Sequence, residues 1–271
     1  MTFYIRCDME GVTGVISFDQ AVKGNKEYES ARHMLMSDIL SVIDGLNESG
    51  SHQIVIYDMH GSDGKNLDID KMPDNVKVYE GKPPYTDTFH QGIDSTFDGL
   101  ILVGFHSMAG TPNGLLAHSY ELETEKILVN NIPVGEIGIE VGIAGEFNVP
   151  LVLITGDSLG IEEARELVPQ TECVVVKDSI SSTSGHCREQ IETAREIREK
   201  ALSIGKKLPS SKPLIFSPPI DLKITLQSSE MCDKMKKMYP EYFVNKHTLE
   251  INGKSLLSAW MKYDNMKRSL R

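Results

Sequence analysis

Two acidic side chains near the N-terminus, Asp8 and Glu10, are the first candidates for chemistry in this sequence. They follow the apolar run Phe3–Cys7, and side chains two residues apart point to the same side of an extended chain. Two carboxylates held close together repel each other unless a cation lies between them, so this spacing favours a metal site over a bare surface. An Asp-x-Glu pair taken alone, however, is more often a solvated strand end.

Two histidines occupy equivalent places in the chain. His60 follows the apolar run Ile54–Tyr57, and His106 follows the run Leu100–Phe105. In an open α/β sheet, ligands bind in the crevice outside the carboxyl ends of the strands, so residues that leave neighbouring strands there converge. A lone histidine at a strand end is more often a structural residue, but two of them together with Asp-x-Glu favour a site.

Carboxylates and imidazoles without a thiolate are typical ligands of zinc, or of cobalt or manganese. Hydrolytic centres of this kind usually hold two ions about 3.5–4 Å apart that share a carboxylate, and the shared water becomes a hydroxide near neutral pH. The residue types therefore favour metal-dependent hydrolysis.

The elements that must position these residues alternate along the chain. Short apolar runs that predict buried strands are Phe3–Cys7, Ile54–Tyr57, Leu100–Phe105, Leu151–Thr155 and Val174–Val176. Helices are predicted at Glu27–Leu46, Val134–Phe147, Ile161–Leu167 and Glu189–Leu208. Such alternation predicts an α/β fold with a largely parallel sheet flanked by helices, and with the metal site at the C-terminal ends of its strands.

The pattern changes after residue 207. The segment Leu208–Pro219 holds four prolines and three serines, and the alternating run Asp221–Leu226 follows it. We predict a catalytic α/β domain at 1–207 and, at 208–271, a smaller α+β lobe or an extension of the main sheet. The sequence does not choose between these two options.

Composition and charge exclude several classes of function. The chain has 271 residues, of which 40% are hydrophobic and 25% charged, as in an ordinary globular protein. Its net charge of −11 repels nucleic-acid backbones and anionic lipids, so we expect neither as a partner, although a local cationic site is still allowed. Four dispersed cysteines and an N-terminus without an apolar signal core lead us to expect a cytoplasmic protein.

Several segments, in order, resemble the motifs of the D-aminopeptidases, a family of binuclear zinc metallopeptidases first associated with bacterial dipeptide-transport operons. The resemblance covers roughly the first two thirds of the chain and is weak beyond Lys207. Any one motif alone is weak evidence, but their order makes the match specific. The segments are CDMEGVTG (7–14), YDMHG (57–61), VGFH (103–106), AHS (117–119), PVGEIG (133–138), LVLITGDS (151–158), ARELVP (164–169) and VVVKDSIS (174–181).

The resemblance implies a specific set of site residues around two divalent ions, with zinc as the first choice. It places the metal ligands on Asp8, Glu10, His60, His106 and Glu136, with Asp8 as the bridge. It also places the family's catalytic histidine on His118, to which we assign polarisation of the scissile carbonyl or transfer of a proton. Without the resemblance, Glu136 is simply a glutamate at a helix N-terminus and His118 an exposed loop residue.

The function implied is a metallo-aminopeptidase that removes the N-terminal residue of short peptides by way of a metal-bound hydroxide, with a preference for D-amino acids such as D-Ala. The resemblance also implies a ring-shaped homo-oligomer, a decamer, that encloses the active sites. Two alternatives stay open. A two-metal phosphoesterase uses the same ligands but needs cations for phosphate, and near the motifs that carry the ligands the sequence offers few besides Arg6 and Lys65. A non-catalytic metal-dependent binding protein would have a closed coordination shell.

Overall fold

The computed structural model describes residues 1–86 and 88–270, and its centre is a seven-stranded sheet with the order β3-β2-β1-β4-β7-β8-β9. The first six strands in this order pair in parallel, and only β9 is antiparallel to its neighbour β8. The strands are β1 (Thr2–Cys7), β2 (Gln53–Asp58), β3 (Val76–Tyr79), β4 (Gly99–Phe105), β7 (Leu151–Asp157), β8 (Glu172–Ser181) and β9 (Ser184–Cys187).

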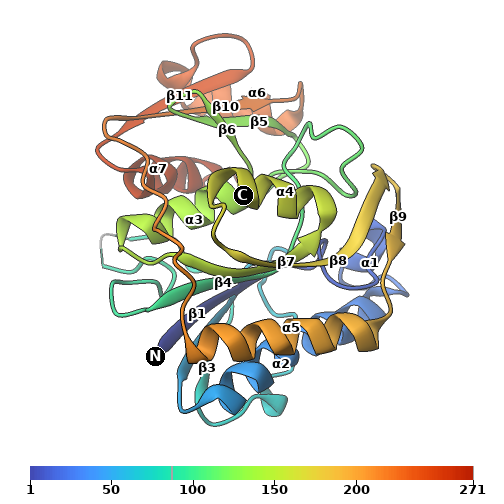
Figure 1. The fold of residues 1–271 in the computed structure, drawn as a ribbon. Coiled ribbons are helices and arrows are strands. Elements are labelled where there is room, and N and C mark those ends of the chain that lie inside the picture. The colour runs from blue at the N-terminus through green and yellow to red at the C-terminus, as the bar shows by residue number, and fades with distance from the viewer. Residues whose placement is uncertain (87, 271) are drawn as a thin grey trace.

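Helices cover both faces of this sheet, and each face has its own apolar core. The helices α2 (Tyr28–Ser49) and α5 (Gln190–Lys206) lie on one face, whereas α3 (Glu136–Glu146) and α4 (Ser158–Leu167) lie on the other (Figure 1). Strands β1, β4 and β7 are buried along almost their whole length. Strands that are covered on both sides need apolar residues on both faces. This explains why apolar and polar residues do not alternate along these strands.

A second, four-stranded antiparallel sheet with the order β11-β10-β5-β6 packs beyond α3. It is formed by β5 (Thr124–Val129), β6 (Ile132–Val134), β10 (Ile220–Leu226) and β11 (Thr248–Gly253), with α6 (Glu230–Met238) and α7 (Leu256–Arg268) beside it. Shorter helical segments are α1 (Phe18–Ala21), η1 (Ile69–Lys71) and η2 (Pro240–Tyr242).

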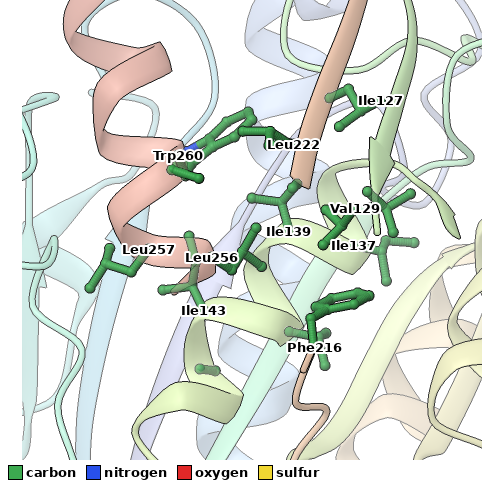
Figure 2. Close-up of a cluster of buried hydrophobic side chains, with 14 of the residues drawn as sticks. Ile127, Val129, Ile137, Ile139, Ile143, Phe216, Leu222, Leu256, Leu257 and Trp260 are labelled. Carbon is green, nitrogen blue, oxygen red and sulfur yellow. The ribbon is translucent and has the colours of Figure 1, made fainter. Parts of the chain in front are cut away.

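A buried apolar cluster joins this second sheet and α7 to α3. Figure 2 shows Ile139 and Ile143 of α3 beside Leu256 and Trp260 of α7, and these side chains are buried. Each fully buried isoleucine or leucine contributes roughly 1.5–3 kcal/mol to folding. The cluster therefore fixes α7 against α3, the helix that begins at Glu136.

The predicted fold class is confirmed: the main sheet is largely parallel, and the C-terminal residues lie in a smaller α+β arrangement. Strands β10 and β11 form a separate sheet instead of extending the main one. The sequence did not predict the β5–β6 hairpin that completes this sheet, whose turn holds Asn130 and Asn131 at positive φ angles of 51° and 66°. The domain boundary at residue 207 stays a prediction.

The topology brings the predicted strand ends together. Strand β1 pairs in parallel with β2 on one side and with β4 on the other, so Asp8, His60 and His106 leave three adjacent strands at the same edge. The chain order reverses between β1 and β4, and such a switch point is where open α/β sheets bind ligands. Within the described residues, no helix is both long and apolar enough to cross a membrane.

The loop after β1 lies directly against the end of β4. The amide of Gly11 donates to the carbonyl oxygen of Gly104 at 2.8 Å, and a Cβ atom at Gly11 would collide with the carbonyl of Phe105. Only glycine allows this close approach, which turns the chain just after Glu10.

Candidate metal centre

Asp8 lies between the two predicted histidine ligands. Its Oδ1 is 2.9 Å from Nδ1 of His60, and its Oδ2 is 3.3 Å from Nε2 of His106. The two oxygens of one carboxylate thus face two different imidazoles. This is the arrangement expected of a carboxylate that bridges two ions.

Glu10 and Glu136 each add a carboxylate to one histidine. Oε2 of Glu10 lies 3.1 Å from Nδ1 of His60, and Oε1 of Glu136 lies 3.5 Å from Nε2 of His106. Two groups of possible ligand atoms result, each within 4.8 Å, and they consist of Asp8, Glu10 and His60 and of His106, His118 and Glu136. The structure thus brings together all six residues named from the sequence.

In each predicted histidine ligand, the ring nitrogen that points away from the carboxylates bonds to a backbone carbonyl. His60 has Nε2 at 2.7 Å from the oxygen of Ala21, and His106 has Nδ1 at 3.0 Å from the oxygen of Ser107. A carbonyl oxygen can only accept, so these ring nitrogens carry the proton. In the neutral ring the other nitrogen therefore directs its lone pair at the carboxylates, which is the orientation a metal ligand needs.

The buried charges favour a cation in this place. Asp8, Glu10, His60, His106 and Glu136 are each less than a tenth exposed. Burial alone would lower the pKa of both predicted histidine ligands, but the neighbouring carboxylates outweigh it and raise the pKa of His60 and His106 well above the usual value. Conversely, burial opposes ionisation of Asp8, but the adjacent imidazoles of His106 and His60 hold its pKa well below normal. The carboxylates thus require positive charge, which either protons or metal ions supply.

Two atoms of this cluster lack a hydrogen bond of good geometry within the described part of the chain. They are Oε2 of Glu10 and Nε2 of His106, although each lies 3.1–3.5 Å from an oppositely charged group. Buried polar atoms are nearly always hydrogen-bonded, so atoms that converge without bonding point to a shared ion. The residues present therefore fit two divalent metal ions.

His118 lies beside this cluster rather than in solvent. Its ring stacks on that of His106, and Nε2 is 3.7 Å from Oε1 of Glu136. Nδ1 lies 2.9 Å from the carbonyl oxygen of Leu116, which fixes the proton on Nδ1 and leaves Nε2 free to accept one. The ring of Phe18 meets that of His118 edge to face at 5.6 Å.

Further buried groups hold the loops that carry the site. Asp58 accepts from the backbone amide of His60, and Asp157 accepts from that of Ser107, so both aspartates fix backbone and do not hydrogen-bond the imidazole rings. Glu163 accepts from the amides of Met108 and Gly135, which join the loop after His106 to the start of α3. Burial raises the pKa of Glu163 to about 7.

Lys177 holds the loop that carries Glu10. Its ammonium is fully buried and donates to the backbone carbonyls of Glu10, Val12 and Val15. These roles of Glu163 and Lys177 were not predicted from the sequence, because one lies in a helix and the other inside a strand, far along the chain from the loops they support. Buried charged residues within otherwise apolar elements are the signal that the sequence offers.

A cavity of about 300 Å³ opens next to the cluster. Five of the six predicted site residues line it, namely Asp8, Glu10, His60, His118 and Glu136, whereas His106 lies deeper. The cations Lys82, Lys267 and Arg268 line the same cavity. The sequence near the motifs therefore indicated fewer cations near the site than the structure shows. Lys82 comes from the segment after β3, and Lys267 and Arg268 come from α7.

Comparison with known proteins assigns this chain to a family. The family model described as D-aminopeptidase matches residues 1–263. The chain belongs to the D-aminopeptidase family. A D-aminopeptidase of Bacillus subtilis (strain 168) is 30% identical over 220 residues, which cover 81% of this chain and 78% of the relative.

A solved structure agrees with this family assignment. The zinc-dependent D-aminopeptidase DppA of Bacillus subtilis, described as a self-compartmentalizing protease, superposes with a TM-score of 0.89 at 26% identity, over 99% of this chain and 97% of that one. The resemblance inferred from the ordered motifs is thus confirmed, and it extends beyond Lys207 to almost the whole chain.

Proposed function

We propose that this D-aminopeptidase family member is a two-metal aminopeptidase that removes the N-terminal residue of short peptides, with a preference for D-amino acids such as D-Ala. The observation that carries the proposal is Asp8, whose two carboxylate oxygens face two separate histidine groups beside a cavity. The family membership supports the peptidase reaction and the D-preference.

In this proposal the two ions are zinc, as in the related DppA. Asp8, Glu10 and His60 would hold one, while Asp8, His106 and Glu136 would hold the other. Bound there, the ions would lower the pKa of a water molecule and polarise the scissile carbonyl. The cavity beside them accommodates a small substrate.

His118 moves a proton in the proposed reaction. Its Nε2 faces Glu136 and carries no proton in the neutral ring, because Nδ1 is held by the carbonyl of Leu116. A base in this position takes a proton from the attacking water and returns it to the leaving amine. The stacked ring of His106 keeps the imidazole of His118 in place during the transfer.

We also propose that the chain assembles into a ring-shaped decamer that encloses its active sites. The support is the likeness to DppA, which is described as self-compartmentalizing. Sedimentation analysis should then give a species of about 300 kDa, ten times the 30.1 kDa of one chain. A monomer or dimer at micromolar concentration contradicts this part of the proposal.

The test of the reaction is hydrolysis by purified protein of D- and L-alanyl dipeptides, with added zinc and after chelation. We expect faster cleavage of the D-alanyl substrates, loss of activity on chelation and recovery with zinc. Full activity after rigorous chelation, or metal binding without hydrolysis of any peptide, contradicts the proposal. The latter result would favour the metal-dependent binding protein.

One observation favours a phosphoesterase as the second candidate: the cations Lys82, Lys267 and Arg268 line the cavity. The same assays should therefore include a phosphate monoester such as p-nitrophenyl phosphate. Peptide hydrolysis without cleavage of the ester excludes this candidate, and the reverse result replaces the proposed function with it.

A further inference from the structure

The four cations that line the cavity differ in their partners. Arg6 forms a buried ion pair with Glu140. Lys267 forms an ion pair with Glu121 at 2.6 Å, and Arg268 forms one with Asp264 at 2.5 Å. Lys82 has no carboxylate within 4 Å among residues 1–86 and 88–270. Lys82 is thus a cavity cation whose charge is not already matched by an ion pair in the described chain.

The surroundings of Lys82 disfavour a positive charge that has no partner. The side chain is partly buried, and burial lowers its pKa, with Asp8 as the largest opposing influence and Lys267 adding repulsion. An ammonium removed from water is stabilised only by hydrogen bonds or an opposite charge. An anionic ligand in the cavity would supply both.

The backbone around Lys82 is held in place from two directions. Arg268, at the end of α7, donates from Nη1 to the carbonyl oxygen of Lys82 at 2.7 Å. The preceding Gly81 donates its amide to the carbonyl of Gly64 at 3.1 Å, in the loop that follows His60. The segment is therefore fixed to the C-terminal helix and to the loop of a predicted metal ligand, so Lys82 has a defined place relative to the site.

We propose that Lys82 binds the C-terminal carboxylate of the substrate peptide, so that the enzyme selects short peptides with a free carboxyl end. This inference rests on the proposed function. A dipeptide carries its amine and its carboxylate at opposite ends, and the cavity offers acidic groups at the predicted metal centre and an unmatched ammonium elsewhere on its lining. The arrangement also gives α7 a role, because its Arg268 positions the segment that recognises the carboxylate.

The experiment compares two substrates that differ only in this charge, D-alanyl-alanine and D-alanyl-alanine amide. For the zinc-loaded wild type, we expect kcat/KM to be about 10- to 100-fold higher for the free acid, as for a charge-assisted hydrogen bond. In Lys82→Met this preference should disappear, through a higher KM for the acid, and Lys82→Arg should retain most of it.

The matched control is Lys267→Met, which removes a cavity cation that already has Glu121 as its partner. We expect its acid-to-amide ratio to stay within threefold of wild type. A wild type without preference for the free acid overturns the inference even if no Lys82 variant folds, and so does a preference that Lys82→Met keeps or that Lys267→Met abolishes. If the protein hydrolyses neither substrate, the proposed function itself is overturned.

Discussion

The imidazole rings of His106 and His118 stack in parallel, with their centroids 4.2 Å apart and their planes 7° from each other. One ring belongs to the predicted ligand set and is 2% exposed, while the other lines the cavity. The stack therefore links the buried cluster of predicted ligands to the cavity. The two histidines have different predicted roles, and these roles can be tested independently.

The first prediction concerns His118→Ala. Removal of a general acid or base typically lowers kcat by about 10²–10⁴-fold, and we expect a loss in this range. Because His118 is not among the predicted ligands, metal analysis should still find two ions per chain. The control is His33→Ala, which changes a histidine of α2 outside the site. A variant of His118 that loses its metal along with its activity would show that the ring is a ligand.

The metal content of Asp8→Asn is the second prediction. Because Asp8 faces both histidine groups, its loss should weaken both ions, and we expect less than one ion per chain after dialysis against a weak chelator. His60→Ala removes a residue of one group only and should retain about one ion. The exposed Asp63→Asn is the control and should keep both. Two ions in Asp8→Asn, at unchanged affinity, would rule out a bridging role.

The sequence predicted the candidate metal centre because its residues obey a rule of topology. Residues that follow parallel strands meet at one edge of the sheet, so Asp8, His60 and His106 could be grouped once the strands were assumed to be neighbours. Glu136 and His118 follow no such rule. They were named through the ordered motifs alone, and the structure places both at the same cluster.

Other features depend on contacts between distant segments, and no local pattern encodes them. The β5–β6 hairpin pairs with β10, about ninety residues later in the chain. Arg268 donates to the carbonyl of Lys82, 186 residues earlier in the chain, and Lys177 donates to the carbonyl of Glu10, 167 residues earlier. Such contacts are set by tertiary packing, so periodicity and motif spacing could not predict them.

A pH dependence of stability is the third prediction. Burial raises the pKa of Asp38 from its ordinary 3.8 to about 6, although Thr13 donates to both carboxylate oxygens. A raised pKa in the folded state favours the protonated form, so the contribution to stability is present below pH 4 and is lost as the pH rises to 6. A rise of the pKa from 3.8 to about 6 corresponds to about 3 kcal/mol of unfolding free energy.

The variant Asp38→Asn should lack this dependence. The difference in unfolding free energy between wild type and variant, measured by urea unfolding at pH 4 and at pH 7, should change by about 3 kcal/mol in favour of the variant at the higher pH. The exposed Asp94→Asn serves as the control and should give parallel curves. A constant difference between wild type and Asp38→Asn across this range would show that the pKa of Asp38 is ordinary.

The final prediction concerns Lys177, whose ammonium supplies hydrogen bonds to three carbonyls of the loop that carries Glu10. In Lys177→Met these buried oxygens lose their donor, and a buried polar group without a partner costs about 1–3 kcal/mol. We expect a lower melting temperature and weaker zinc binding, because the side chain of Glu10 is then less firmly oriented. Lys200→Met, which breaks the partly exposed pair with Glu172, should lower stability by at most about 1 kcal/mol. Calorimetry and zinc titration of both variants measure these effects, and wild-type zinc affinity in a folded Lys177→Met would show that the lysine supports only the fold.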